Sequence, residues 1–142
     1  MKADDMPRLV NLLAGCSICL NSGSTFAIDG IIHDKPVILT LFDGEAEVPW
    51  HRSIVRYNDV IHMRKLIELG GLRVTSSYDE LAETIKNYLA DPTLDSEGRQ
   101  RSRARECGEI DGQACTRIAK VLATLVDARA LDSRPETTVT NG

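Results

Sequence analysis

Aromatic side chains are scarce in this sequence, at 4% of its 142 residues. A surface that stacks bases or flat sugars in a row needs more aromatic side chains, so such a surface is not expected. A basic excess is also missing, because the formal net charge is -4. Since Lys and Arg supply most of the affinity for a phosphate backbone, nucleic acid is not an expected partner. A small anionic ligand needs only a local site.

Other features are missing as well. The first 16 residues lack the cationic segment and apolar run of a signal peptide, and no apolar stretch is long enough to span a bilayer. We therefore expect a cytoplasmic protein without a transmembrane segment. The four cysteines include one C-x-x-C pair, Cys16 and Cys19, whereas structural zinc normally takes two close-spaced pairs. Free thiols and no bound metal are expected.

Short apolar runs alternate with helical patterns along most of the chain, which is typical of a parallel α/β sheet. The pattern predicts a partial Rossmann-like domain, with about three parallel strands flanked by helices and a helical C-terminal part. A long loop at 43–58 is a candidate functional loop. We expect strands at 16–20, 37–42 and 72–75, and helices at 6–14, 25–33, 59–69, 78–90, 96–107 and 113–128.

The later helices differ in composition. The helix at 78–90 carries a capping box, with Ser77 three residues before Glu80. The helix at 96–107 is nearly all polar and is expected to be solvated, whereas the helix at 113–128 has an apolar face that is expected to dock on the core. Residues 132–142 are predicted to be a disordered tail, which leaves 1–131 as the domain.

A polar, glycine-bearing turn follows the first predicted strand and opens directly into a helix. Ligands of parallel sheets collect at the carboxyl ends of strands, and a helix N-terminus attracts anions, so this turn is a candidate anion site. The alternative is a plain turn with a capped helix. One helical turn later, a carboxylate at Asp29 is placed to accept hydrogen bonds from a ribose diol, or else is a first-turn acid or a partner of Lys35. The turn consists of Ser22, Gly23, Ser24 and Thr25.

The residues at 21–29, followed by the Lys-Pro-Val-Ile step at 35–38, resemble the donor-nucleotide segment of GT-B glycosyltransferases. The segment at 77–126 resembles the closing helices of the same domain. The resemblance implies that the chain is part of the C-terminal, nucleotide-binding domain of such an enzyme. It also implies roles for individual residues: the diphosphate is held by Ser22, Gly23, Ser24 and Thr25, the ribose by Asp29, and the donor sugar is contacted by Asp43, Gly44 and Glu45.

The same resemblance implies a transferase that uses a nucleotide-sugar donor, as in polysaccharide biosynthesis, and that needs a missing N-terminal lobe or a homodimer partner. No D-x-D motif is present, so a mechanism without a metal or other cofactor is expected. His51 in the long loop is a candidate catalytic base, or else a structural histidine. Related alternatives are CDP-glycerol-type glycerophosphotransferases and UDP-N-acetylglucosamine 2-epimerases. A non-catalytic module that binds a nucleotide or a partner is the alternative of a different class.

Overall fold

The computed structural model describes residues 4–132, and the side chains of residues 4–127. The chain divides into two compact units, Met1–Gly108 and Glu109–Gly142, which are described separately. The elements of the first unit are α1 (Asp5–Gly15), β1 (Cys19–Asn21), α2 (Phe26–Ile32), β2 (Val37–Thr40), the 3-10 helix η1 (Ile54–Asp59), α3 (Ile61–Glu68), β3 (Arg73–Thr75), α4 (Tyr78–Ala90) and α5 (Ser96–Cys107).

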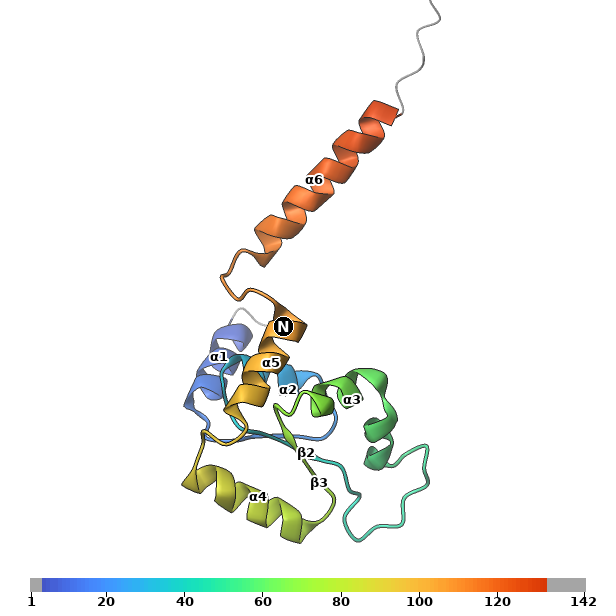
Figure 1. The fold of residues 1–142 in the computed structure, drawn as a ribbon. Helices are drawn as coiled ribbons and strands as arrows, with labels where there is room; N and C mark the ends of the chain where they lie inside the picture. The colour runs from blue at the N-terminus through green and yellow to red at the C-terminus, as the bar shows by residue number, and fades with distance from the viewer. Residues whose placement is uncertain (1–3, 133–142) are drawn as a thin grey trace, which may run out of the picture. The chain divides into compact units, whose positions relative to one another are not determined.

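The three strands form one parallel sheet in the order β1-β2-β3, which confirms the predicted fold class. Figure 1 shows α4 on one face of the sheet and α2, with α5 packed against it, on the other. Both crossovers place helices against the sheet, as parallel strands require. The C-terminal ends of all three strands therefore lie at the same end of the sheet, where the turns that follow the strands lie close together.

The hydrophobic core lies between the sheet and α2. Val37 and Leu39 of β2 are fully buried there against Ala27 and Ile31 of α2. Ile38 is buried equally well but belongs to the opposite face of the sheet, because side chains alternate along a strand. The central strand is thus covered on both faces, as its continuous apolar sequence predicts.

The edge strand β1 differs from its prediction. It runs from Cys19 to Asn21 rather than over 16–20, because the backbone after α1 reaches the sheet only where the Cys19 N–H bonds to Pro36 O. It is also not buried on both faces: Leu20 is 52% exposed, since α4 contacts β2 and β3. The predicted loop at 43–58 was correct over most of its length, but its last residues form η1.

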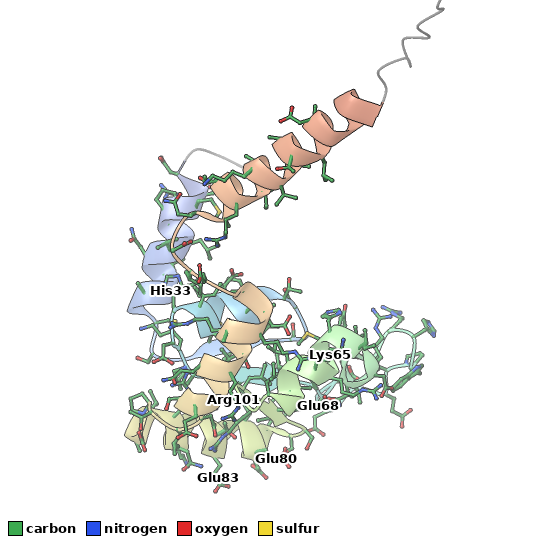
Figure 2. All side chains as sticks on the ribbon, turned by 45° about the horizontal axis from the view of Figure 1, so that its top comes forward. His33, Lys65, Glu68, Glu80, Glu83 and Arg101 are labelled. Atoms are coloured by element: carbon green, nitrogen blue, oxygen red, sulfur yellow. The ribbon has the colours of Figure 1, made fainter. Side chains whose placement is uncertain are left out.

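The cap of α4 was predicted correctly in part. Ser77 Oγ accepts a hydrogen bond from the Glu80 N–H at 3.2 Å. The Glu80 carboxylate reaches back one residue further than a capping box requires, and accepts from the hydroxyl and the N–H of Ser76, which lowers the pKa of Glu80. Figure 2 shows Glu80 and Glu83 on the outer side of this helix.

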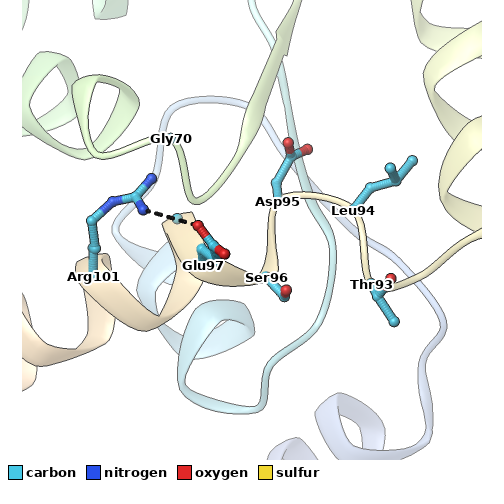
Figure 3. A pocket seen from close by; sticks show the side chains of 8 residues that line it. Gly70, Thr93, Leu94, Asp95, Ser96, Glu97 and Arg101 are labelled. Carbon is cyan, nitrogen blue, oxygen red and sulfur yellow. Dashed lines mark ion pairs between the residues drawn. The ribbon is translucent and has the colours of Figure 1, made fainter.

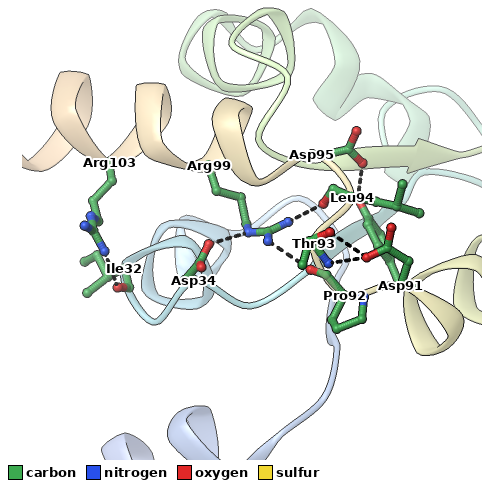
Figure 4. A network of polar contacts seen from close by, with 10 residues as sticks. Ile32, Asp34, Asp91, Pro92, Thr93, Leu94, Asp95, Arg99 and Arg103 are labelled. Atoms are coloured by element: carbon green, nitrogen blue, oxygen red, sulfur yellow. Dashed lines mark hydrogen bonds and ion pairs between the residues drawn. The ribbon is translucent and has the colours of Figure 1, made fainter.

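The expectation that α5 is fully solvated was wrong for one face. Arg99 and Ser102 are buried at 2% and 1% exposure, and the backbone at Gly98 lies directly against Gly70 and Gly71. The guanidinium of Arg99 donates hydrogen bonds to Asp34 and to the turn before α5 (Figure 4). The burial of Arg99 was not predicted because its acidic partner Asp34 lies 65 positions away and its nearer partners are backbone carbonyl groups, which have no sequence signal.

The second unit contains α6 (Ala114–Asp132). Asp111 accepts hydrogen bonds from the Gln113 N–H and from the Arg117 side chain, close to the predicted helix start. The large apolar side chains of α6 that the structure describes are more than half exposed, as Leu122 illustrates at 56%, and docking of this helix stays a prediction. Among the described residues, no helix combines the length and apolarity that crossing a bilayer requires. The predicted tail lies outside the described residues, except for Asp132.

Candidate functional site

A cavity of about 440 Å³ lies where the strands end. It joins the turn after β1 to the loop after β2 and to the first turn of α4. Its volume falls within the range of small-molecule sites, about 300 to 1,000 Å³. We call it the strand-end cavity; its lining includes Ser22, Thr40, Phe42, Asp43, Gly44 and Tyr78.

The turn at 22–25 is held by the last residue of β1. The Asn21 side chain accepts a hydrogen bond from the Ser24 N–H at 2.7 Å and donates one to Ser24 O at 3.0 Å. Ser24 Oγ in turn accepts from the Phe26 N–H at the start of α2. Among the described residues, the N–H groups of Ser22, Gly23 and Thr25 have no acceptor. The turn is therefore held by its own hydrogen bonds and leaves three backbone donors without an acceptor in the described part of the chain, those of exposed Ser22 and Thr25 and that of buried Gly23.

Gly23 is required by packing as well as by conformation. Its φ is +87°, and a Cβ at this position would lie 2.7 Å from Cγ of Tyr57. Tyr57 belongs to η1, so the long loop after β2 folds back and covers the turn. A side chain at position 23 would displace that loop, which explains the glycine without a ligand.

Asp29 and Thr25 lie on the side of α2 that faces away from the sheet. The sheet side of this helix is formed by Ala27, Gly30 and Ile31, which are buried. Asp29 is half-buried and close enough to α5 for its charge to contribute to the raised pKa of Cys107, for which burial is the main cause. Thr25 lines a smaller cavity of about 150 Å³ between α2, α3 and α5. Neither residue lines the strand-end cavity.

Asp43 is engaged in holding the loop in which it lies. Its Oδ2 accepts a hydrogen bond from Ser53 Oγ at 2.6 Å, and its Oδ1 accepts one from the Ile54 N–H at 2.8 Å. These two bonds lower the pKa of Asp43, with the Ser53 hydroxyl as the larger cause. The carboxylate thus fastens the beginning of the loop to its end, and it lies in the wall of the strand-end cavity.

A second cavity of about 360 Å³ adjoins the first and shares Phe42, Gly44 and Tyr78 with it. We call it the α4 cavity. Glu45 lines it, together with Asp79 of α4. The structure therefore brings together Ser22, Asp43 and Gly44 at the strand-end cavity and places Glu45 at the adjoining α4 cavity.

His51 is exposed in a turn of the long loop and lines neither cavity. Its carbonyl oxygen accepts a hydrogen bond from the Arg56 side chain. His62 lines the cavity that contains Thr25, and His33 follows the end of α2. A role for His51 as a base stays a prediction that the cavity geometry does not support.

A further cavity, of about 410 Å³, lies at the N-terminus of α5 (Figure 3). The charged side chains that line it are paired with one another or with side chains outside the cavity. Glu97 lies 3.8 Å from Arg101, and Asp95 accepts hydrogen bonds from Arg73 and Tyr88. These pairs leave little chemistry to offer to a ligand.

Two contributors to the site have no strong sequence signal. Tyr78 occupies the first position of a helix, where the pattern indicates only a helix start. Tyr57 lies in a segment without periodicity, and its contact with Gly23 joins residues 34 positions apart. The one sequence feature that these two residues share is that they belong to the few aromatic residues of the chain.

No protein-family model, curated protein or solved structure matches this chain.

Proposed function

We propose that this chain binds the donor of a nucleotide-sugar-dependent glycosyl transfer, as the nucleotide-binding part of a GT-B-type transferase. The diphosphate lies at the turn of 22–25, the ribose at Asp29, and the sugar in the strand-end cavity. The observation that carries the proposal is that Ser22 and Gly44, from the turns after two neighbouring strands, line one cavity of about 440 Å³.

The electrostatics of the turn support an anionic ligand. Three backbone N–H groups, those of Ser22, Gly23 and Thr25, are without an acceptor among the described residues. Backbone donors that are fixed before the reaction stabilise charge as it develops on a leaving group. The negative charge of a diphosphate rises when the bond to the sugar breaks, so these donors act on the transition state more than on the bound donor.

The two ends of the ligand then leave the turn in different directions. Asp29 lies on the side of α2 that faces away from the sheet, and the strand-end cavity lies beyond Ser22 toward β2. A nucleoside at Asp29 and a sugar in the cavity therefore place the diphosphate between them.

Calorimetric titration of the full chain tests the proposal, with UDP, CDP, GDP and ADP, their diphospho-sugars, and CDP-glycerol as ligands. Ser22→Ala removes a hydroxyl that takes no part in the internal bonds of the turn, and Asp29→Ala removes the carboxylate. Each is expected to weaken binding by about 1 to 3 kcal/mol, while Glu83→Ala, an exposed acid on α4, has no effect. A preference for CDP-glycerol assigns the glycerophosphotransferase alternative instead.

The internal completeness of the turn favours a second candidate function, that of a non-catalytic module. Asn21 satisfies Ser24, and Tyr57 covers Gly23 without any ligand. If the folded chain binds none of the nucleotides, the turn is only a helix start, and the module alternative replaces the transferase.

A further inference from the structure

Tyr78 is the most exposed aromatic side chain at the strand-end cavity. It is the first residue of α4, its side chain is 59% exposed, and it lines both the strand-end cavity and the α4 cavity. The ring therefore forms a wall between two openings and is accessible to a ligand that enters either one.

The ring is held in place although it is exposed. It lies edge-to-face against Phe42, with the ring centroids 4.9 Å apart and an angle of 84° between the ring planes. On a further side, Tyr78 Oη lies 2.8 Å from the position that a Cβ of Gly44 would take, so the hydroxyl packs closely against the backbone of this glycine. A ring that is fixed before a ligand arrives binds at a lower cost in conformational entropy than a free one.

The groups around the ring suit a polyhydroxylated ligand. Ser22 and Thr40 line the strand-end cavity, where the Thr40 hydroxyl donates to Asn21 O and can still accept, and the acidic residues Glu45 and Asp79 line the α4 cavity. Hydroxyls and carboxylates accept hydrogen bonds from sugar hydroxyls, while an aromatic ring covers the apolar C–H face of a sugar. Ligand pockets combine an apolar wall and a few polar groups in this way.

We propose that Tyr78 determines specificity by stacking on the sugar ring of the donor, with Phe42 and Gly44 positioning it. This inference rests on the proposed function, which puts the diphosphate at Ser22 and the nucleoside on the other side of α2. The only part of the donor that reaches the strand-end cavity is then the sugar. Tyr78 contacts the part of the ligand that distinguishes one donor from another.

The experiment compares nucleoside diphosphates with their diphospho-hexoses. The full-length wild-type chain is titrated by calorimetry with UDP and UDP-glucose, GDP and GDP-mannose, and ADP and ADP-glucose. The same titrations are made with Tyr78→Ala and with Tyr78→Phe, which retains the ring. Trp50→Ala is the matched control, because Trp50 is an aromatic residue of equal exposure, 60%, that lines neither cavity. Circular dichroism checks that each variant is folded.

The expected result is a loss of about threefold to tenfold in the affinity of Tyr78→Ala for the diphospho-hexose, with no change for the parent diphosphate. Tyr78→Phe and Trp50→Ala bind like the wild type. An unchanged affinity of folded Tyr78→Ala for the diphospho-hexose overturns the inference, and so does an equal loss for the parent diphosphate, which would place the nucleotide on the ring. If the wild type binds none of these ligands, the proposed function itself fails, and the inference with it.

Discussion

Replacement of Arg99 is expected to remove a large part of the stability of the first unit. Its side chain is 2% exposed, and its guanidinium makes three hydrogen bonds: Nε to Asp34 Oδ1 at 2.8 Å, and the terminal nitrogens to Leu94 O at 2.6 Å and Pro92 O at 3.0 Å (Figure 4). The three acceptors belong to the turn after α2 and the turn before α5. Arg99 therefore fastens α5 to the turn after α2, which is 65 positions away in sequence, and to the turn that directly precedes α5.

The expected loss of stability follows from the hydrogen bond that each acceptor loses when Arg99 is replaced. Asp34 is 59% exposed, so water replaces most of its interaction with Arg99. The carbonyl groups of Leu94, which is half-buried, and Pro92, which is exposed, lose a charged donor, and a group that stays buried without a partner costs about 1 to 3 kcal/mol. With the cavity left by the side chain, we expect Arg99→Ala to lower the free energy of unfolding by about 3 to 5 kcal/mol. Arg99→Met, which fills the space, is expected to lose about 2 to 4 kcal/mol.

Urea unfolding followed by far-UV circular dichroism measures these differences. The matched control is Asp34→Asn, because position 34 has a φ of +52° that asparagine tolerates. That variant keeps the two carbonyl bonds of Arg99 and is expected to lose about 0.5 to 1 kcal/mol. The reasoning is refuted if Arg99→Ala loses less than about 1 kcal/mol, or if Asp34→Asn destabilises the chain as much as Arg99→Ala does.

Three further predictions concern α5 and its surroundings. In Gly98→Ala, the new Cβ overlaps the carbonyl oxygen of Gly70, so we expect a loss of about 3 kcal/mol or more in urea unfolding. Gly15→Ala, where a Cβ meets nothing within 4 Å, is the control and stays near the wild type. Ser102→Ala removes a buried hydroxyl that has no hydrogen-bond partner among the described residues, and is expected to be neutral or stabilising by up to about 1 kcal/mol in the same assay. Burial opposes ionisation of Asp95, but hydrogen bonds from its arginine and tyrosine partners outweigh it and lower its pKa. A depressed folded-state pKa stabilises the fold above the unfolded value, about 3.9, and this contribution is lost as the pH falls through the folded-state pKa. Urea midpoints measured from pH 6 down to pH 2 should therefore fall less steeply for Asp95→Asn than for the wild type.

Local signals in the sequence located the elements well. The boundaries of α5 and the cap of α4 by Ser77 were predicted because both depend on residues within one or two helical turns. The parallel sheet was predicted from the alternation of apolar runs and helical patterns, whereas its strand order was not predicted. The bounds of β1 were predicted incorrectly, at 16–20 instead of Cys19–Asn21, because pairing with the sheet begins at the bond from Cys19 N–H to Pro36 O. That contact cannot be deduced from a local apolar run.

Side-chain partners across the fold were not predictable in the same way. Arg99 and Asp34 are 65 positions apart, and nothing around Arg99 distinguishes it from the other arginines of α5. Tyr57 and Gly23 pack together only because the loop after β2 folds back over the turn after β1. In both cases residues in a polar or irregular stretch of the sequence form a packed contact. Hydrophobic periodicity does not predict such contacts, because it indicates burial only for apolar side chains.

Two acidic residues of the candidate site, Asp29 and Asp43, differ in their contacts within the fold. The sequence predicted Asp29 as a ribose ligand, with a first-turn acid or a partner of Lys35 as alternatives, whereas the resemblance implied a contact of Asp43 with the donor sugar. Asp43 has both oxygens bonded to Ser53 and Ile54, so under the proposed function a donor sugar shares an oxygen with these bonds or contacts another group. Asp29 has no such commitment among the described residues and lies on the far side of α2. Under the proposed function, acidic contacts to the sugar come from Glu45 and Asp79, which line the α4 cavity together with Tyr78. Asp43 maintains the shape of the loop that contains Phe42 and Gly44, both of which lie against the side chain of Tyr78.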